Sequence, residues 1–333
     1  MSELRYVATS GDWVLVAPSR SLRPHDPVPS ASAGGPRASR VPECPFCPGN
    51  EGMTPPELWR STDAAGRWKQ RGVPNLFPLL DSEARADPES DRFGWLTRGG
   101  RGRHEVLIES PDHDWDVATA GTDEVRDLLL AYRNRYLVLR EDRPALIAVF
   151  RNHGQAAGTS LPHPHSQLVA LPVIPIPTRH RLDIARRHLD ESGTCLYADL
   201  LERELIDGRR ILIQYGDFVA YQPFAASVPY ETWIMPRRQQ ASFGELQDDA
   251  VPALARVLRA VLAALRRRLD DPPYNLVISS VPPPEEGTRY FVWHIRVLPR
   301  ITNPAGLELE TGIAVNPSLP EETAADLRKA LGS

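Results

Sequence analysis

The chain lacks any apolar run long enough to cross a bilayer, since no window approaches the ~20 apolar residues that a membrane-spanning helix needs. It begins MSELRYVATSGDWVLVAP, without the basic region, apolar stretch and small-residue cleavage site of a secretory signal. Cysteine is scarce: there are three in 333 residues, two of them spaced C-x-x-C. This number argues against a disulfide framework and indicates a reducing compartment. We therefore expect a cytoplasmic protein.

An excess of charge of one sign is also missing. The 39 lysines and arginines are balanced by 43 aspartates and glutamates, which gives a net charge of -4. Proteins that bind nucleic acids or membrane surfaces usually carry a strong basic excess. We therefore expect neither kind of partner. The composition, with 41% apolar and 25% charged residues, is typical of a soluble globular protein, and the length suffices for two domains.

The two halves of the chain repeat one order of predicted elements. Apolar alternation and helical spacing predict each element, and the Pro- and Ser-rich segment 23–42 is predicted to be a loop. The first half is expected to contain strands at 12–17, 103–109, 145–150 and 168–171, and a helix at 122–141. The second is expected to contain strands at 230–235, 274–279 and 291–298, and a helix at 245–269.

The repetition extends to short motifs. His104-Glu105-Val106 opens one unit and Tyr230-Glu231-Thr232 the other, while His163-Pro164-His165 and His294-Ile295-Arg296 close them. An internal duplication is the simplest explanation, although two ordinary halves could match by coincidence. We predict an α+β fold of two units, 1–178 and 179–333, each a mostly antiparallel sheet with a packed helix.

The segment from Asn152 to Gln167 contains the most specific chemical pattern. His163 and His165 stand at alternate positions of an extended segment, where both side chains can face one pocket. The preceding Gly- and Ser-containing stretch, which includes Gly158 and Ser160, can bring backbone N–H groups close to a phosphate. A neutral imidazole is a good nucleophile near pH 7. The alternatives are structural histidines or histidines that bind a metal.

Cys44-Pro-Phe-Cys47 is half of a plausible zinc site, because two thiolates on a tight loop suit Zn²⁺. No second C-x-x-C follows, and Cys195 is isolated, so the remaining ligands would have to be histidines. A redox dithiol or a free pair is the alternative.

The pattern N-x-G, G-x-S and H-P-H-x-Q resembles the active-site segment of galactose-1-phosphate uridylyltransferases, a nucleotidyltransferase branch of the histidine-triad superfamily. The resemblance covers nearly the whole chain and implies two fused histidine-triad-like halves. It implies that His165 is the nucleophile, which holds a nucleotidyl group between two transfer steps. It also implies that Gln167 hydrogen-bonds the transferring phosphoryl group. Related hydrolases resemble H-x-H-x-H, with histidine where Gln167 stands, and glutamine is no efficient acid or base.

The resemblance further implies a ligand set and a group of substrate-binding residues. Ser110-Pro-Asp-His113 matches a ligand-bearing segment and His163 the first histidine of H-P-H, so a structural Zn²⁺ would be held by Cys44, Cys47, His113 and His163. Substrate contacts are implied for Arg20, Arg23, Asn75, Phe77, Asn152, Gly158 and Ser160. Arg20 and Arg23 would bind phosphate, which suits two guanidinium groups.

Three departures from the family pattern concern the substrate and a second metal. Leu76 stands where the well-studied branch has Asp, and Arg296 replaces one ligand of a second metal site. The segment GLELETGIAVNP (306–317) lacks a lysine and a tyrosine of sugar-binding members. It is closer to shorter relatives, some of which act on ADP-glucose with phosphate as the acceptor.

The resulting expectation is a uridylyltransferase that moves UMP from UDP-glucose to galactose 1-phosphate, as a homodimer by analogy with the family. The alternative within the family is an adenylyltransferase or phosphorylase that acts on ADP-glucose or a dinucleoside polyphosphate. A hydrolase and a non-catalytic, zinc-dependent nucleotide-binding protein are the alternatives from other classes.

Overall fold

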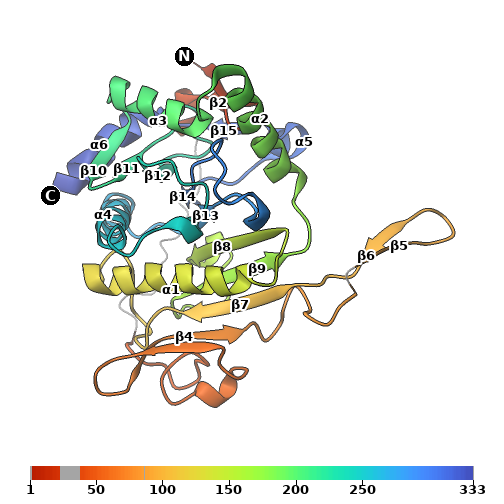
Figure 1. Ribbon diagram of the computed structural model, residues 1–333. Coiled ribbons are helices and arrows are strands. Elements are labelled where there is room, and N and C mark those ends of the chain that lie inside the picture. Colours follow the sequence, from red (N-terminus) through yellow and green to blue (C-terminus); the bar gives the residue numbers. More distant parts are fainter. Residues whose placement is uncertain (1, 23–37, 86, 333) are drawn as a thin grey trace.

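A single antiparallel sheet of ten strands forms the centre of the molecule (Figure 1). The computed structural model describes residues 2–22, 38–85 and 87–332, so Arg23 and most of the loop predicted at 23–42 lie outside the described residues. Within those ranges, no helix is both long and apolar enough to cross a membrane. The sheet has the order β10-β11-β12-β14-β13-β8-β9-β7-β4-β3. Its strands are β3 (Trp59–Thr62), β4 (Trp68–Pro74), β7 (Arg103–Ile108), β8 (Leu146–His153), β9 (His165–Leu171), β10 (Ile211–Tyr215), β11 (Phe218–Tyr221), β12 (Thr232–Pro236), β13 (Tyr274–Ser279) and β14 (His294–Pro299).

The strand order shows an internal duplication. From the centre outwards, the first unit runs β8, β9, β7, β4, β3 and the second runs β13, β14, β12, β11, β10. The two units join edge to edge, because β8 pairs with β13 and Asn152 lies opposite Asn275. The fold class is therefore confirmed: an α+β protein of two fused units, each with an antiparallel sheet and a packed helix.

The strand register corrects the residue-level match that the sequence suggested. His165 opens β9 and His294 opens the equivalent strand β14, so His294 corresponds to His165 and not to His163. Likewise, Glu105 lies opposite Leu168 and Thr232 opposite Val297, which makes Glu231 the counterpart of His104. A shift of one residue along a strand moves a side chain to the other face of the sheet. Sequence spacing alone could not detect this shift.

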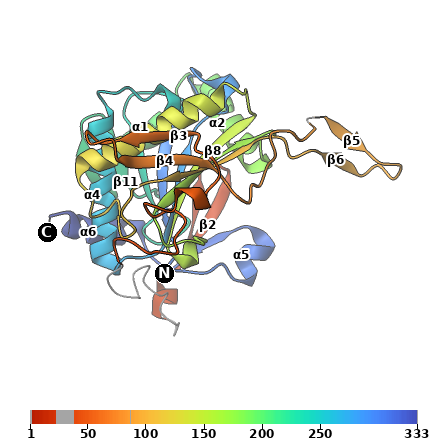
Figure 2. The same cartoon turned by 90° about the horizontal axis from the view of Figure 1, so that it is seen from below.

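Two long helices cover one face of the sheet, one from each unit (Figures 1 and 2). Helix α1 (Thr122–Arg140) begins where the Glu124 carboxylate accepts the backbone N–H of Gly121 at 2.8 Å. Helix α4 (Val251–Leu269) buries a continuous apolar stripe against α1 and the sheet. This packing forms the largest apolar core of the described chain, and residues such as Leu107 and Ile295 contribute to it from the sheet.

Helix α4 starts six residues later than the helix predicted from residue 245. Residues 243–245 form a separate 3₁₀ turn that Ser242 caps, and Pro252 lies in the first turn of α4. Proline is tolerated there because its missing N–H would have no partner inside the helix. The sequence predicted one continuous helix here, because apolar residues keep a helical spacing on both sides of the break.

The opposite face of the sheet is covered differently in the two units. Helices α2 (Ile176–Ser192) and α3 (Leu196–Asp207), which the sequence analysis did not predict, pack there against the second unit. On the first unit, Cys44, Phe46 and Cys47 pack against Val106 and Ile108 of β7. The boundary predicted at residues 178 and 179 falls within α2 and stays a prediction.

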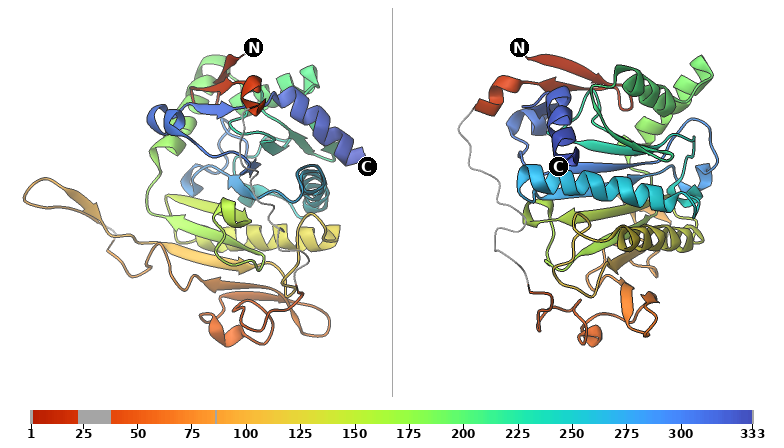
Figure 3. Two further views of the ribbon diagram at one scale, coloured as in Figure 1. Left: turned by 180° about the vertical axis from the view of Figure 1, so that it is seen from behind. Right: turned by 90° about the vertical axis from the view of Figure 1, so that its left-hand side faces the viewer.

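Strands from near the two ends of the chain pair in a small second sheet, and one hairpin projects from the body (Figure 3). Strands β1 (Glu3–Val7) and β2 (Asp12–Val16) are antiparallel, and β15 (Ala314–Asn316) pairs with β2 in parallel. A 3₁₀ turn, η1 (Pro18–Leu22), follows β2. The hairpin of β5 (Pro88–Ser90) and β6 (Leu96–Arg98) extends beyond the rest of the molecule. The remaining helices are α5 (Gly306–Thr311) and α6 (Pro320–Gly332).

Candidate active site

His165 stands at the first position of β9, with one ring nitrogen held by the backbone. Its Nδ1 lies 2.9 Å from the carbonyl oxygen of His163, and a carbonyl only accepts, so Nδ1 carries the hydrogen. Nε2 then has the lone pair in the neutral ring. Burial is the main cause that lowers the pKa of His165 below its usual range, which favours the neutral, nucleophilic form. The edge of the Phe46 ring packs against the imidazole, with 5.5 Å between ring centroids.

Gln167 lies two residues further along β9 and is oriented by a second histidine. The backbone N–H of Leu79 donates to Nδ1 of His104 at 3.1 Å, so the hydrogen of His104 is on Nε2. That hydrogen is donated to the side-chain oxygen of Gln167 at 2.8 Å. The amide NH₂ of Gln167 therefore remains available as a donor to a substrate. Asn75 lies beside this pair, with its Nδ2 3.1 Å from His104 Nε2.

A buried polar network lies behind the strand, on the side of α1. The Glu109 carboxylate faces the guanidinium of Arg151 at 3.0 Å, and both side chains are buried. Ser166 and Tyr132 also donate to Glu109, and Arg151 donates to the Tyr274 hydroxyl at 2.6 Å. Ser166 directly follows His165, so the network fixes the backbone of the candidate nucleophile. Because Tyr274 belongs to β13, it also ties the two units together.

The segment between β8 and His163 contains the predicted phosphate-binding residues. Gly158 adopts a left-handed backbone with φ of +89°, which a residue with a Cβ rarely tolerates. A Cβ at Gly158 would lie 3.9 Å from Nδ2 of Asn152. The Asn152 side chain is held by Nδ2 of Asn275, which donates to its oxygen at 2.8 Å. Ser160 is exposed.

Four side chains that could bind a metal ion lie close together around His163, two residues before His165. Cys44, Cys47, His113 and His163 are all buried, and their ligand atoms lie within 4.8 Å of one another. His163 lies in a bend rather than in the strand, so it faces this cluster and does not share a pocket with His165 as the alternating pattern predicted. The isolated pair Cys44 and Cys47 is thereby completed by two histidines, as the resemblance implied.

The separations in this cluster suit a tetrahedral metal ion. With metal–nitrogen bonds of ~2.05 Å and metal–sulfur bonds of ~2.3 Å, tetrahedral ligands stand about 3.3 Å (N to N) and 3.6 Å (S to N) apart. The two Nδ1 atoms of His113 and His163 are 3.2 Å apart, and the sulfur-to-nitrogen distances are 3.4 to 3.7 Å. Nε2 of His163 donates to the Ser110 carbonyl at 2.8 Å, which leaves its Nδ1 free to ligate. Burial lowers the pKa of His163 to about 4, so the ring is neutral.

Two further predicted contacts, Arg20 and Phe77, are exposed, and Arg23 lies outside the described residues. Arg20 is exposed in η1, which lies beside the small sheet, at the opposite end of the molecule from the segment with Cys44 and Cys47 (Figure 3). Phe77 is 82% exposed, and its backbone N–H donates to the Asn75 side chain at 2.9 Å. The roles of Arg20, Arg23 and Phe77 stay predictions.

Comparison with known proteins finds relatives that cover nearly the whole chain. Residues 1–175 match the model of the galactose-1-phosphate uridyl transferase N-terminal domain. An ADP-glucose phosphorylase of Arabidopsis thaliana is 33% identical over 331 residues, covering 98% of this chain and 92% of the relative. A galactose-1-phosphate uridylyltransferase of Thermotoga maritima is 28% identical, with 99% and 98% covered. The crystal structure of an Arabidopsis ADP-glucose phosphorylase with bound ADP-glucose superposes with a TM-score of 0.85, at 32% identity and 99% and 98% coverage.

The chain belongs to the galactose-1-phosphate uridylyltransferase family. This family consists of nucleotidyltransferases, so the enzyme class expected from the sequence is confirmed. The named relatives act on two different substrates, ADP-glucose and galactose 1-phosphate.

The sequence analysis did not identify several residues that shape this uridylyltransferase-family site. His104 was noted only as the start of a repeated motif, although it orients Gln167. Glu109 and Arg151 were not noted as a pair, because 42 residues separate them and only strand pairing brings them together. The available signal was a charged residue directly after an apolar run, Glu109 after 106–108 and Arg151 after 145–150, since buried charges require a partner.

We predict that Glu109→Ala lowers the free energy of unfolding by about 3–5 kcal/mol, because it leaves the Arg151 guanidinium buried without its carboxylate. Urea denaturation measures the change. Asp142→Ala is the matched control: it breaks an ion pair with Arg103 in which both side chains are 42% exposed, and it should cost no more than ~1 kcal/mol. Equal losses in the two variants would contradict the importance of the buried pair.

Proposed function

We propose that the protein transfers a nucleotidyl group through a covalent bond to Nε2 of His165. The observation that carries this proposal is the His165 Nδ1–H bond to the His163 carbonyl, which presents the Nε2 lone pair beside Gln167. The family membership supports the same chemistry. The first step forms a bond between Nε2 and the α-phosphorus of a nucleoside diphosphate sugar. The bond from that phosphorus to the bridging oxygen breaks, and the sugar 1-phosphate leaves with the electron pair.

In the second step an acceptor phosphate oxygen attacks the same phosphorus, and the phosphorus–nitrogen bond breaks. Nε2 regains its lone pair, and the nucleotidyl group leaves on the acceptor. The Nδ1–H bond to the carbonyl stabilises the ring while Nε2 carries the phosphoryl group. The NH₂ of Gln167 would donate to a phosphoryl oxygen in both steps, since its carbonyl oxygen is engaged by His104.

Transfer to a phosphate acceptor is favoured over hydrolysis. Gln167 occupies the position after H-P-H where a hydrolase would need a group that exchanges protons, and an amide cannot do so efficiently. The nucleotidyl-histidine would therefore persist until an acceptor with its own ionised oxygen arrives.

ADP-glucose is the donor, and inorganic phosphate the acceptor, that the comparisons support best. The ADP-glucose phosphorylase of Arabidopsis is 33% identical and matches with a TM-score of 0.85. Leu76, where the well-studied branch has Asp, agrees with a different nucleoside contact. Uridylyl transfer from UDP-glucose to galactose 1-phosphate is the second candidate, favoured by the family model and the 28% identical Thermotoga relative.

We further propose that Cys44, Cys47, His113 and His163 hold Zn²⁺ in a structural role. Two thiolates and two imidazoles are a closed tetrahedral set, and the distances between their ligand atoms suit such an ion. The ion would link the Cys44–Cys47 loop to the segment that precedes His165. Its contribution would be the position of His165 and not activation of water.

A homodimer is the assembly we propose, with the β5–β6 hairpin as part of the contact. Phe93, Trp95 and Leu96 on this hairpin are 69–73% exposed. A hairpin of two short strands is at best marginally stable in water by itself, and exposed apolar groups of this kind mark interaction sites. A second copy of the chain would cover them.

We predict that incubation with ADP-glucose adds the mass of an AMP group to the intact protein, and that His165→Ala abolishes the adduct. Intact-mass spectrometry measures this, with UDP-glucose in a parallel incubation. His188→Ala, which removes a histidine of α2 paired with Asp199, should label like the unchanged protein. Addition of UMP alone would support the second candidate. An adduct that persists in His165→Ala would refute the assigned nucleophile.

Cys44→Ser should reduce bound zinc from about one ion per chain, the stoichiometry of a closed four-ligand site, and should lower the melting temperature. Atomic absorption and thermal denaturation measure the two effects. Cys195→Ser is the control, because Cys195 lies outside the cluster. Unchanged zinc content in Cys44→Ser would count against the site.

Replacement of Phe93 and Trp95 by serine should convert a dimer to a monomer, since it removes the apolar side chains of the proposed contact. Size-exclusion chromatography with light scattering measures the mass. Thr97→Ala, an exposed polar position on the same hairpin, should leave the dimer intact. A monomeric unchanged protein, or a dimer that survives the double substitution, would contradict this assembly.

A further inference from the structure

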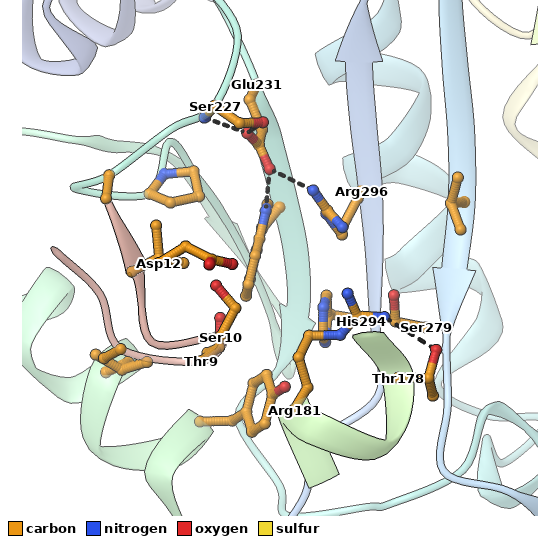
Figure 4. Close-up of a pocket in the computed structure, with 18 of the residues that line it drawn as sticks. Thr9, Ser10, Asp12, Thr178, Arg181, Ser227, Glu231, Ser279, His294 and Arg296 are labelled. Atoms are coloured by element: carbon orange, nitrogen blue, oxygen red, sulfur yellow. Dashed lines mark hydrogen bonds and ion pairs between the residues drawn. The ribbon is translucent and has the colours of Figure 1, made fainter. Parts of the chain in front are cut away.

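A cavity of about 460 Å³ lies beside His294 of the second unit (Figure 4), and residues of β1, β2 and β8 also line it. It is bounded by the turn between β1 and β2, the start of α2, and the ends of β12 and β14. His165, Gln167 and the side chains described around them do not line it. Its volume is within the range of ~300–1,000 Å³ that is typical of small-molecule sites.

The cavity occupies the position in the second unit that corresponds to the His165 site in the first. His294 opens β14 as His165 opens β9, and its Nδ1 donates to the carbonyl of Val292, two residues earlier, at 3.0 Å. Two positions further on, Arg296 replaces Gln167. Glu231 takes the place of His104 and binds Arg296 at 3.0 Å, as His104 binds Gln167. The duplicated scaffold therefore retains the imidazole but surrounds it with different groups.

The surroundings of His294 are less suited than those of His165 to stabilising a transferring phosphoryl group. The segment before His294 contains three consecutive prolines, Pro282 to Pro284, although it also has a left-handed glycine, Gly287, as the first unit has Gly158. Proline has no backbone N–H, so these residues cannot donate to phosphate oxygens. The Trp233 ring also stacks on the His294 ring, with 4.3 Å between the ring centroids. Binding without covalent transfer is the chemistry that these features favour.

Two guanidinium groups face the cavity with part of their hydrogen-bonding capacity unused. Arg181 is half-buried, and within the described chain no carboxylate lies at ion-pair distance from it; its Nη2 donates to Thr178 at 3.2 Å. Nε of Arg296 is buried and finds no partner among the described residues. Burial, to which the neighbouring charge of Arg296 adds, lowers the pKa of Arg181. A buried charge of this kind is stabilised by an anion.

Two of the three acidic groups in the cavity are engaged with other partners, and of the three only the charge of Asp12 opposes the lowering of the Arg181 pKa. Glu231 already accepts hydrogen bonds from Ser227, Trp233 and Arg296. Glu204 is paired with Arg210. Asp12 is exposed at the start of β2, and Figure 4 shows it with Ser10 across the cavity from Arg181.

We propose that this cavity binds a small phosphorylated molecule with a hydroxyl-bearing ring, such as a sugar phosphate or a nucleoside monophosphate. The phosphoryl group pairs with Arg181 and with Nε of Arg296. Nε2 of His294 carries a lone pair, because Nδ1 holds the hydrogen, and accepts a hydrogen bond from a ring hydroxyl. The aromatic walls of Trp13, Tyr197 and Trp233 pack against the ring.

Calorimetric titration of the full chain tests the proposal, with glucose 1-phosphate, AMP, UMP and inorganic phosphate as separate probes. We expect at least one organic probe to bind at two sites per chain in the unchanged protein. Arg181→Ala should weaken one of them at least tenfold, and Arg181→Lys, which keeps the charge, by less. The probe that binds most tightly shows which class of molecule supplies the phosphoryl group. Covalent labelling of His165 should be unchanged in both variants.

Arg179→Ala is the matched control, since Arg179 is an exposed arginine of the same helix that does not line the cavity. It should keep both sites, and melting temperatures show whether each variant is folded. A single site in the unchanged protein that Arg181→Ala does not affect would overturn the proposal. Equal losses of binding in Arg179→Ala and Arg181→Ala would also overturn it. Binding of inorganic phosphate but of none of the organic probes would do the same. Because labelling of His165 is measured separately, failure here does not bear on the proposed transferase reaction.

Discussion

The hydrogen bond from His165 Nδ1 to the carbonyl of His163 is the interaction on which the candidate active site depends. A carbonyl has no hydrogen to give, so this one contact determines the tautomer of His165 and leaves the lone pair on Nε2. The carbonyl must itself be held in place. His163 is held on one side by the Cys44, Cys47 and His113 cluster, and Ser166 is held on the other by Glu109. The candidate nucleophile therefore lies between two rigid attachments, which is what preorganisation of a transfer site requires.

The sequence was sufficient to predict the fold class and the family, because both rest on local patterns. Alternation predicted the central strands, helical spacing predicted α1, and the H-P-H-x-Q segment indicated the family. The start of α4 was misplaced, since its apolar spacing continues through a proline-containing break. Helices α2 and α3 were missed, because their apolar faces are short and interrupted by charges.

The parts of the site that could not be predicted are those that depend on register between distant strands. His104 is 63 residues from Gln167, and Glu109 is 42 residues from Arg151. Their roles follow only when β7 is placed beside β9, with each residue on a particular face. The match of Glu231 with His104 shows the same limitation: the motif spacing suggested Glu105, and a shift of one residue decides which face of the sheet a side chain occupies.

Duplication left two equivalent imidazoles, and their different neighbours explain why only one is suited to catalysis. Next to His165, the neutral amide of Gln167 is oriented by His104. It can keep donating a hydrogen bond to a phosphoryl group while the charge on that group changes. Next to His294, an arginine already paired with a buried carboxylate provides permanent charge, and the prolines remove backbone donors. Permanent positive charge stabilises a bound anion in the ground state as well as in a transition state, and uniform stabilisation does not accelerate a reaction. The second unit thus has the features of a binding site and the first those of a catalytic one, although both use the same strands.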